Sequence, residues 1–337
     1  MNVIIIGCGL IGRKRALALS DSDKLVACCD TNNEVAKKFA DDFSCSFYTD
    51  YKKALDESRS DVIIVAVINK FAKEIIIDSL KSGKHIIAEK PLGRNFGEAR
   101  EIFKVLDNLN SDSEKLILKT GFNHRFHPGI WKAKQLADSG KIGKVFNIRA
   151  RYGHGGRSGM EKEWRASKDL CGGGELLDQG VHVIDLIRWF GGEVSEVYGS
   201  IETKFWEMEV EDNAFVILKT KSEVTAAFQV SWTNWKNIFS FEIFGTDGYI
   251  KIEGLGGSYG AEILEIGLRK KEGGRPDIEV IEFPNEDISW KEEWKEFKAA
   301  INEKREVTGS GLDGLKANEV IEAIYNSNSG KEVIYLD

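Results

Sequence analysis

Short apolar runs alternate with amphipathic stretches over the first 120 residues. Such runs occupy 2–6 (NVIII), 24–29 (KLVACC), 61–67, 84–90 and 114–121. Strands that are buried on both faces have this continuous apolar character, and parallel sheets bury both faces. The alternation with helical stretches therefore predicts a parallel, doubly wound sheet, and ligands are expected beyond the carboxyl ends of its strands.

The pattern changes from about residue 143, where strands follow one another without helices between them. These runs are rich in Val, Ile, Phe and Thr, and they lie at 144–153, 196–205, 213–220, 223–232, 238–245 and 248–254. Thr-Asp-Gly at 246–248 predicts a tight turn between the last two. Successive strands predict an antiparallel sheet, with one face partly covered by a helix within 171–192. Two late helices are expected at 290–302 and 312–327.

The chain is long enough for two domains. We expect an α/β Rossmann domain at 1–122 that binds a dinucleotide. We expect an α+β domain at 123–337, with a large, open, mainly antiparallel sheet, to bind the substrate. A large exposed sheet face needs cover, so this second domain is also expected to form a homodimer or homotetramer.

Glycines in the first strand–helix turn indicate the dinucleotide. Gly7, Gly9 and Gly12 have G-x-G-x-x-G spacing, and Asp30 ends the next strand. Such glycines allow a pyrophosphate to approach the helix N-terminus closely. A carboxylate at Asp30 would bond the adenosine ribose and repel a 2′-phosphate, so NAD is expected rather than NADP. The expected cofactor contacts are Gly7, Gly9, Leu10, Ile11, Gly12, Asp30, Asn69, Glu89 and Lys90.

A nucleotide-free domain with a glycine-rich turn is the alternative. The basic residues Arg13, Lys14 and Arg15 open the same helix. Cations are unfavourable beside a helix N-terminus unless an anion binds there, so they fit a bound phosphate. They fit a solvated, charged turn equally well.

Residues 171–192 (CGGGELLDQGVHVIDLIRWFGG) contain a candidate for proton transfer. Asp178, His182 and Asp185 are spaced i, i+4 and i+7, which places them on one face of an α-helix. A carboxylate and an imidazole on one rigid element have the fixed geometry that acid–base catalysis needs. An ordinary Asp–His pair on a helix surface is the alternative.

A glycine-rich stretch before this helix predicts a substrate loop. Seven glycines within 151–174 are interspersed with Arg151, His154, Arg157, Trp164 and Arg165. Arginines beside an aromatic suit a sugar or an anion, and desolvated arginines need an anionic partner, so a substrate carboxylate or phosphate is expected. A flexible solvated loop is the alternative, and the acidic segment 206–212 is interpreted as a solvated turn. The expected substrate contacts are Arg125, His154, Arg157, Trp164, Arg165, Asp178 and His182.

Composition argues against several other classes of function. A net charge of −7 and an isoelectric point near 5.5 disfavour nucleic acid as a partner. The sequence has neither an apolar run of the roughly 18 residues in a membrane span nor a signal peptide, so a cytoplasmic protein without a membrane partner is expected. The five cysteines are odd in number and lack a C-x-x-C pair, so neither disulfides nor a metal site is expected.

Six motifs follow one another in a characteristic order. They are GCGLIG (7–12), GKHIIAEKPL (83–92), GFNHRF (121–126), WR (164–165), GGGELLDQGVHVIDL (172–186) and AIYNSNSGKEV (323–333). Together they resemble the glucose–fructose oxidoreductase/inositol dehydrogenase family. The resemblance implies that Lys90, Asp178 and His182 are catalytic and that Pro91 follows a cis peptide bond. His182 would act as base, Lys90 would hold the reacting oxygen, and Asp178 would orient the imidazole.

The resemblance also implies the reaction. An NAD-dependent dehydrogenase would oxidise a secondary hydroxyl, or reduce the matching ketone, of a sugar, sugar nucleotide or cyclitol. The segment 152–165 is similar to a subset from bacterial surface-carbohydrate pathways, which favours a sugar or sugar nucleotide. The chain departs from the family at 67–72, where Asn69 is kept but the usual Thr, Pro and His are absent. His124 and His127 are expected behind the substrate contacts or between the domains. Two alternative functions are a non-catalytic dinucleotide-binding regulator and an NAD-dependent glycosidase.

Overall fold

The protein forms two compact units in a computed structural model that describes residues 1–112, 115–284 and 286–337. The first unit comprises Met1–Phe122 and Trp290–Asn318, and the second comprises Asn123–Ser289 and Glu319–Asp337. The segment Trp290–Asn318 thus belongs to the first unit, whereas we expected all of 123–337 to form the second domain. This segment belongs to the first unit because the apolar side chains of its helix pack on the first sheet.

The first unit contains the predicted parallel, doubly wound sheet. Among the described residues its strand order is β3-β2-β1-β4-β5-β6, the order of a Rossmann fold. The strands are β1 (Asn2–Ile6), β2 (Lys24–Cys29), β3 (Ser46–Tyr48), β4 (Val62–Val65), β5 (His85–Ala88) and β6 (Leu118–Thr120). The helices are α1 (Leu10–Ala18), α2 (Asn33–Phe43), α3 (Tyr51–Glu57), α4 (Asn69–Lys81), α5 (Phe96–Asp112) and most of α9 (Ser289–Glu303). Strand β6 is shorter than the predicted run 114–121, whose residue 114 lies outside the described residues.

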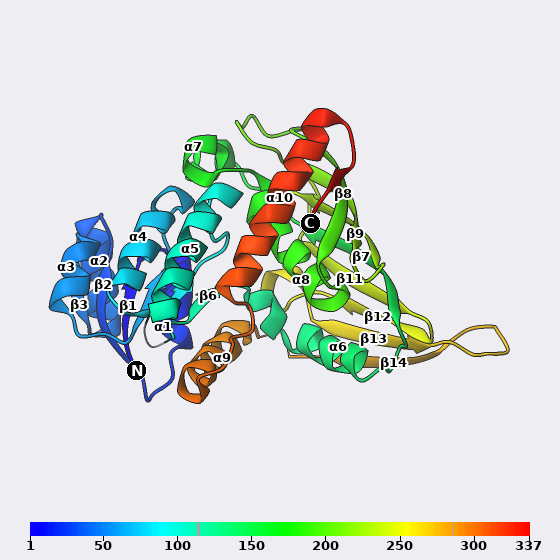
Figure 1. Cartoon of the computed structure of the whole chain (residues 1–337), viewed down its shortest axis with the longest axis horizontal. Helices are drawn as coiled ribbons and strands as arrows, with labels where there is room; N and C mark the ends of the chain where they lie inside the picture. The colour runs from blue at the N-terminus through cyan, green and yellow to red at the C-terminus, as the bar shows by residue number, and fades with distance from the viewer. Residues whose placement is uncertain (113–114, 285) are drawn as a thin grey trace. The chain divides into compact units, whose positions relative to one another are not determined.

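Apolar side chains cover both faces of this sheet. Ile4 and Ile63 cluster with residues of α4 and α5, which lie side by side in Figure 1. Val3, the neighbour of Ile4 on β1, joins the opposite cluster, which α1, α2 and α9 complete. Trp294 and Phe297 of α9 are buried in that second cluster. Burial on both faces explains why the strands are continuous apolar runs and why the first unit needs α9.

The second unit contains the predicted open sheet. Among the described residues its strand order is β14-β13-β12-β11-β7-β10-β9-β8-β15, and only β7 and β10 pair in parallel. The strands are β7 (Val145–Gly153), β8 (Val194–Glu202), β9 (Asn213–Thr220), β10 (Thr225–Ser231), β11 (Ile238–Gly245), β12 (Gly248–Glu253), β13 (Ile263–Leu268), β14 (Asp277–Glu282) and β15 (Ile334–Tyr335). The helices are α6 (Pro128–Asp138), α7 (Lys168–Cys171), α8 (Val181–Gly191) and the part of α10 (Gly311–Gly330) that follows Asn318. Short helical turns are η1 (Asn123–Phe126), η2 (Met160–Lys162), η3 (Trp164–Ala166), η4 (Leu176–Gly180) and η5 (Gly257–Tyr259).

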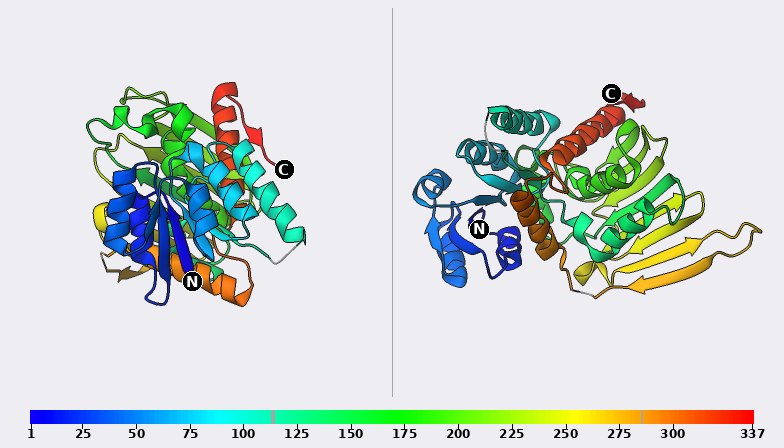
Figure 2. Two further views of the ribbon diagram at one scale, coloured as in Figure 1. Left: turned by 90° about the vertical axis from the view of Figure 1, so that its left-hand side faces the viewer. Right: turned by 60° about the horizontal axis from the view of Figure 1, so that its bottom comes forward.

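One face of this second sheet is covered and the other is open. Helices α6 and α8 lie against one face, as the right-hand view of Figure 2 shows. On β9, Val216 and Leu218 are buried, whereas Phe215 and Ile217 are 55% and 56% exposed. Alternate residues of a strand point to opposite faces, so this strand presents large apolar side chains on the open face.

Candidate active site

The turn between β1 and α1 fits only glycine at two of its three glycine positions. Gly7 has φ +100°, and a Cβ built on it would lie 2.2 Å from the carbonyl oxygen of Ala66. A Cβ on Gly12 would lie 2.0 Å from the carbonyl oxygen of Gly7. At Gly9, by contrast, a Cβ would meet nothing within 4 Å. The turn is thus tightly packed inside and open at Gly9, which is where a ligand can approach the backbone closely.

Helix α1 presents a bare N-terminus at this turn. Gly9 is its N-cap without a side-chain hydrogen bond, and its first turn carries no acidic residue. The carboxylate of Asp30, directly after β2, accepts hydrogen bonds from the backbone N–H groups of Cys8 and Asn32, each at 3.0 Å. Leu10 is 73% exposed and Ile11 is half-buried. Free backbone N–H groups at a helix N-terminus suit an anion, and Asp30 is held beside them, so these residues fit a dinucleotide.

The basic residues of α1 have partners within the first unit. Arg13 pairs with Asp42, and the ammonium group of Lys14 lies 5.2 Å from the centre of the Trp290 ring. The guanidinium of Arg15 is buried and donates to Glu89 at 2.7 Å. Each of these three cations thus has a partner within the protein and needs no bound phosphate, so the basic run does not support the dinucleotide interpretation.

Three further expected cofactor contacts follow strands of this sheet. Asn69 begins α4, a few residues after β4, and Glu89 and Lys90 directly follow β5. The peptide bond between Lys90 and Pro91 is cis, as the resemblance implied. The carboxylate of Glu89 is occupied by Arg15. This placement favours a role for Glu89 in orienting the segment that carries Lys90 rather than in touching the cofactor.

The glycines before η4 allow the backbone to pack closely. A Cβ on Gly173 would lie 2.2 Å from the hydroxyl of Tyr325, and one on Gly174 would lie 1.9 Å from the carbonyl oxygen of Glu211. The buried carboxylate of Glu211 accepts from the N–H of Leu176 at 3.1 Å and from Tyr325 at 2.8 Å. Burial raises the pKa of Glu211. These contacts fix the start of the helical segment that carries Asp178.

The predicted Asp–His–Asp face is divided in the structure. Asp178 lies in η4, a π-helical turn, whereas His182 and Asp185 lie in α8. A π-turn bonds i to i+5 and therefore changes the phase of the side chains. Buried Asp185 accepts from the Arg125 guanidinium at 2.8 and 2.6 Å, so it does not belong with Asp178. Because Arg125 is itself buried in this pair, a structural role is favoured over the expected substrate contact.

His182 lies in a cluster of aromatic rings. Its imidazole stacks on that of His124, with 3.7 Å between ring centres and 20° between planes. The ring of Tyr152 is 5.2 Å from that of His124, and the ring of Tyr259 is 5.3 Å from that of Tyr152. The amide of Gln179 donates to the Tyr259 hydroxyl at 2.9 Å. Burial raises the pKa of Tyr259 to about 12 and that of Tyr152 well above its ordinary value, so both phenols stay neutral hydrogen-bonding groups.

Tyr152, Tyr259 and Gln179 were not identified from the sequence as neighbours of the candidate site. Tyr152 is the second-last residue of β7 and looks like an ordinary core aromatic. The one available signal was the glycine-rich segment 254–260 around Tyr259.

Two of the three arginines in 151–174, Arg157 and Arg165, also have carboxylate partners. Arg165 lies 3.4 Å from Asp178, and its guanidinium is 4.3 Å from the centre of the Trp164 ring. Arg157 pairs with Glu163 at 2.6 Å on the surface. These two charges are paired within the protein, whereas Arg151 lies on β7 and lines the open face of the sheet. An anionic substrate therefore stays a prediction. The imidazole of His154 accepts from the N–H of Gly156 at 2.9 Å, and burial lowers the pKa of His154.

The acidic segment 206–212 is not the solvated turn that we predicted. Asp212 is buried and accepts hydrogen bonds from the N–H groups of residues 204, 205 and 206 at 2.8–2.9 Å. Burial alone would raise the pKa of Asp212, but these bonds outweigh burial and lower it. Two of its acids, Glu211 and Asp212, therefore hold loops around the site.

The described residues contain neither a membrane-spanning helix nor a cluster of metal ligands. Within 1–112, 115–284 and 286–337, none of the helices combines the length and hydropathy of a membrane span. Over the same residues, no group of three His, Cys, Asp or Glu side chains is arranged to hold a metal ion.

Comparison with known proteins gives matches over both units. Residues 1–111 match the oxidoreductase family with an NAD-binding Rossmann fold, and residues 130–251 match the GFO/IDH/MocA C-terminal domain. Levoglucosan dehydrogenase from Pseudarthrobacter phenanthrenivorans is 26% identical over 74% of this chain and 73% of its own length. Myo-inositol 2-dehydrogenase from Thermotoga maritima is 26% identical over 74% of each chain. A solved structure of levoglucosan dehydrogenase with NADH has a TM-score of 0.89 and 23% identity, and it covers 100% of this chain and 99% of that one.

Proposed function

Since the chain belongs to the GFO/IDH/MocA family of NAD-binding oxidoreductases, we propose that it oxidises a secondary hydroxyl of a carbohydrate or cyclitol, or reduces the matching ketone. One observation supports the NAD-dependent part above all: the open glycine turn at Gly9 beside the fixed carboxylate of Asp30. A carboxylate there suits the ribose hydroxyls of NAD and repels the 2′-phosphate of NADP. The relatives named for levoglucosan and inositol support the substrate class.

The proposed chemistry assigns a role to three side chains. NAD supplies the ring that accepts the hydride. His182 takes the proton from the substrate hydroxyl, because a neutral imidazole is a suitable base near pH 7. Lys90 holds the reacting oxygen and stabilises its developing negative charge, and Asp178 orients the imidazole. In this proposal the first unit binds NAD, and the second binds the carbohydrate through Trp164, Arg165 and His154.

A panel experiment tests the proposal. NADH formation should be followed with monosaccharides, anhydrosugars, sugar nucleotides and inositols, beside thermal-shift titrations with NAD and NADP. A ligand that binds only the folded protein raises the melting temperature by mass action. We expect a larger shift with NAD than with NADP and turnover of at least one sugar or cyclitol. Binding of NAD without turnover would indicate a regulator, and cleavage of a chromogenic glycoside without net NADH would indicate a glycosidase.

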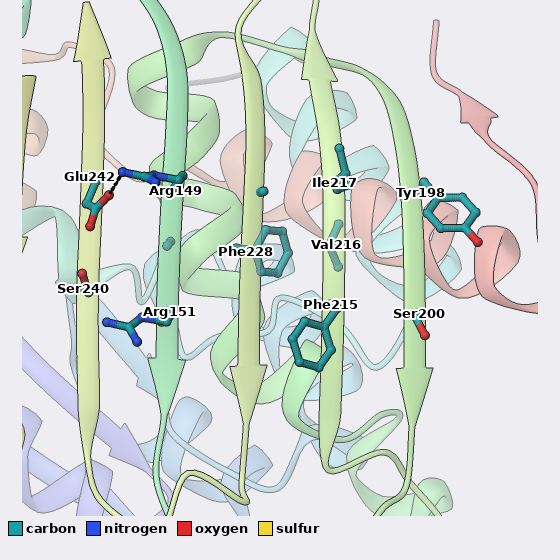
Figure 3. Close-up of a pocket in the computed structure, with 12 residues that line it drawn as sticks. Arg149, Arg151, Tyr198, Ser200, Phe215, Val216, Ile217, Phe228, Ser240 and Glu242 are labelled. Atoms are coloured by element: carbon teal, nitrogen blue, oxygen red, sulfur yellow. Dashed lines mark ion pairs between the residues drawn. The ribbon is translucent and has the colours of Figure 1, made fainter.

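The open face of the nine-stranded sheet suits self-association. A hollow of about 560 Å³ lies on it, and Figure 3 shows its lining residues, Tyr198, Phe215 and Ile217 among them. The salt bridge between Arg149 and Glu242 crosses two neighbouring strands of the same face. Exposed apolar patches of this kind mark association surfaces. We therefore propose a homodimer or homotetramer through this face, which light scattering on the Ile217→Lys variant tests. A cytoplasmic location stays a prediction that cell fractionation can check.

A further inference from the structure

Three loops of the second unit leave the same end of its sheet. Strands β7 and β10 are parallel, and β8 and β10 are both antiparallel to β9. Strands β7, β8 and β10 therefore point in one direction, as the arrowheads below Arg151, Ser200 and Phe228 show in Figure 3. The loops that follow them are 154–159, 203–212 and 232–237. Residues of these loops are therefore brought together at one end of the sheet.

Two large aromatic side chains are exposed on these loops. Phe205 is 58% exposed and Trp235 is 63% exposed. Their rings lie 4.8 Å apart between centres and are nearly perpendicular, at 80°. Trp206 packs edge-on against Phe205 at 5.2 Å, and its indole N–H donates to the carbonyl of Trp232 at 3.0 Å. Trp206 therefore supports the exposed pair, which we call the Phe205–Trp235 platform.

The backbone around the platform is shaped to hold it. Trp235 has φ +56°, a left-handed conformation that is costly for a bulky residue. A Cβ on Gly155 would lie 3.0 Å from the Cα of Trp235, and one on Gly156 would lie 2.4 Å from the Trp206 ring. Strained residues persist only where their surroundings fix them, and such residues cluster at functional sites. Two glycines of the loop that sequence analysis singled out therefore serve to seat these aromatics.

The platform adjoins residues of the proposed substrate site. The carbonyl of His154 accepts from the N–H of Asn234 at 3.1 Å, directly beside Trp235. The imidazole of His154 is also close enough to Asp178 and Arg165 for an electrostatic interaction with both. His154 therefore connects the Phe205–Trp235 platform with the part of the second unit that carries the proposed catalytic carboxylate.

We propose that the Phe205–Trp235 platform binds a second sugar ring, attached to the ring whose hydroxyl is oxidised; this inference rests on the proposed function. The C–H face of a pyranose is apolar and packs on an aromatic ring, which is then removed from water. The nearby Arg157–Glu163 pair is surface-exposed and offers donors and acceptors to sugar hydroxyls. Arg157 and Arg165 already have carboxylate partners, which favours a neutral saccharide over a nucleotide diphosphate next to these two side chains.

The size of the platform also favours a small ligand over a protein. A fully buried aromatic side chain contributes about 150–250 Å², so two partly exposed rings offer well under the roughly 800 Å² that each partner buries in a standard interface. A sugar ring, by contrast, is matched by one or two aromatic rings.

Selectivity between paired sugars tests the proposal. The probes are glucose with maltose and cellobiose, and galactose with lactose, each assayed for kcat/KM in the presence of NAD and for binding by calorimetry in its absence. We expect the wild type to prefer at least one disaccharide over its monosaccharide by about tenfold. Trp235→Gly should abolish this preference. Glycine favours the left-handed backbone at this position, so the variant should fold as well as the wild type.

A control and three outcomes complete the design. Tyr335→Ala removes another exposed aromatic, 74% accessible on the edge strand β15, and should leave the preference unchanged. If the wild type shows equal kcat/KM and equal affinity for each monosaccharide and its disaccharide, the platform does not bind a second sugar ring. If Trp235→Gly keeps the wild-type preference for the disaccharide, the proposal is also refuted, whether or not the variant forms a smaller oligomer. Disaccharide binding that depends on Trp235, without NADH formation from any sugar, supports the platform while refuting the proposed function.

Discussion

Replacing Glu293 by glutamine should destabilise the first unit by about 3 kcal/mol, because it breaks a buried group of four charges. The Glu293 carboxylate accepts from Arg15 and lies 3.3 Å from the ammonium group of Lys119. Arg15 also pairs with Glu89 at 2.6 Å. Arg15, Lys119 and Glu293 are at most 2% exposed, and Glu89 is 13% exposed. The group is neutral as it stands, and the substitution leaves it with one uncompensated positive charge.

The magnitude follows from burial. Two unit charges 3.3 Å apart attract by about 5 kcal/mol at an effective dielectric constant near 20. Relief from the cost of desolvating a carboxylate offsets part of this loss. Measured losses on removing one partner of a buried pair are about 3–5 kcal/mol. The exposed Lys73–Glu101 pair in the same unit is a matched control, and Glu101→Gln should cost less than about 1 kcal/mol.

Urea unfolding followed by tryptophan fluorescence measures both variants. A double variant sharpens the test: Lys119→Met in the Glu293→Gln background restores neutrality and should recover 1 kcal/mol or more, as coupled neighbours do. Two results would refute the reasoning. One is a loss for Glu293→Gln no larger than for Glu101→Gln. The other is a double variant whose loss equals the sum of the two single losses.

Three further predictions concern cofactor, catalysis and pH. Asp30→Ser should narrow the preference for NADH over NADPH, measured as the ratio of dissociation constants by fluorescence titration. Lys90→Ala and His182→Ala should each lower kcat by about 10²-fold or more while NAD still raises the melting temperature; near-normal turnover of either variant would contradict its role. The pKa of Asp212 is lowered in the folded protein, so its stabilisation is complete above the unfolded value near 4 and is lost as pH falls below it. The stability difference between wild type and Asp212→Asn should thus be largest at pH 7 and shrink in acid, and a pH-independent difference would contradict this assignment.

Local patterns predicted the strands that bury at least one face. Strands β1, β2, β9 and β11 have the bounds expected from their sequence runs, because apolar side chains at the buried positions mark each of them. Strand β14 reads Asp-Ile-Glu-Val-Ile-Glu and is mostly exposed at the edge of its sheet, so its sequence carries little burial signal. Strand β3 is only three residues long. Such elements owe their existence to a neighbouring strand rather than to their own pattern.

The candidate site likewise has parts that could be predicted from the sequence and parts that could not. The glycine turn was recognisable because its spacing and the following acid are local in sequence. The Arg125–Asp185 pair and the His124–His182 stack join residues about 60 positions apart, which no pattern along the chain indicates. The π-turn at η4, which carries Asp178, was not expected from the helical spacing either. The charge balance of Arg157 and Arg165 likewise became visible only once their partners were in place.

The return of α9 to the first unit has a consequence for how the chain acquires its structure during synthesis. Trp294 and Phe297 pack with Val3 and Ile5, nearly 300 residues earlier. A ribosome making about 5–20 residues per second completes the first strands many seconds before α9 emerges. During that interval the part of this sheet face that α9 covers in the finished protein remains exposed and prone to aggregation. The second unit is largely synthesised in between, so chaperones are expected to protect the growing chain until α9, in the final seventh of the sequence, appears.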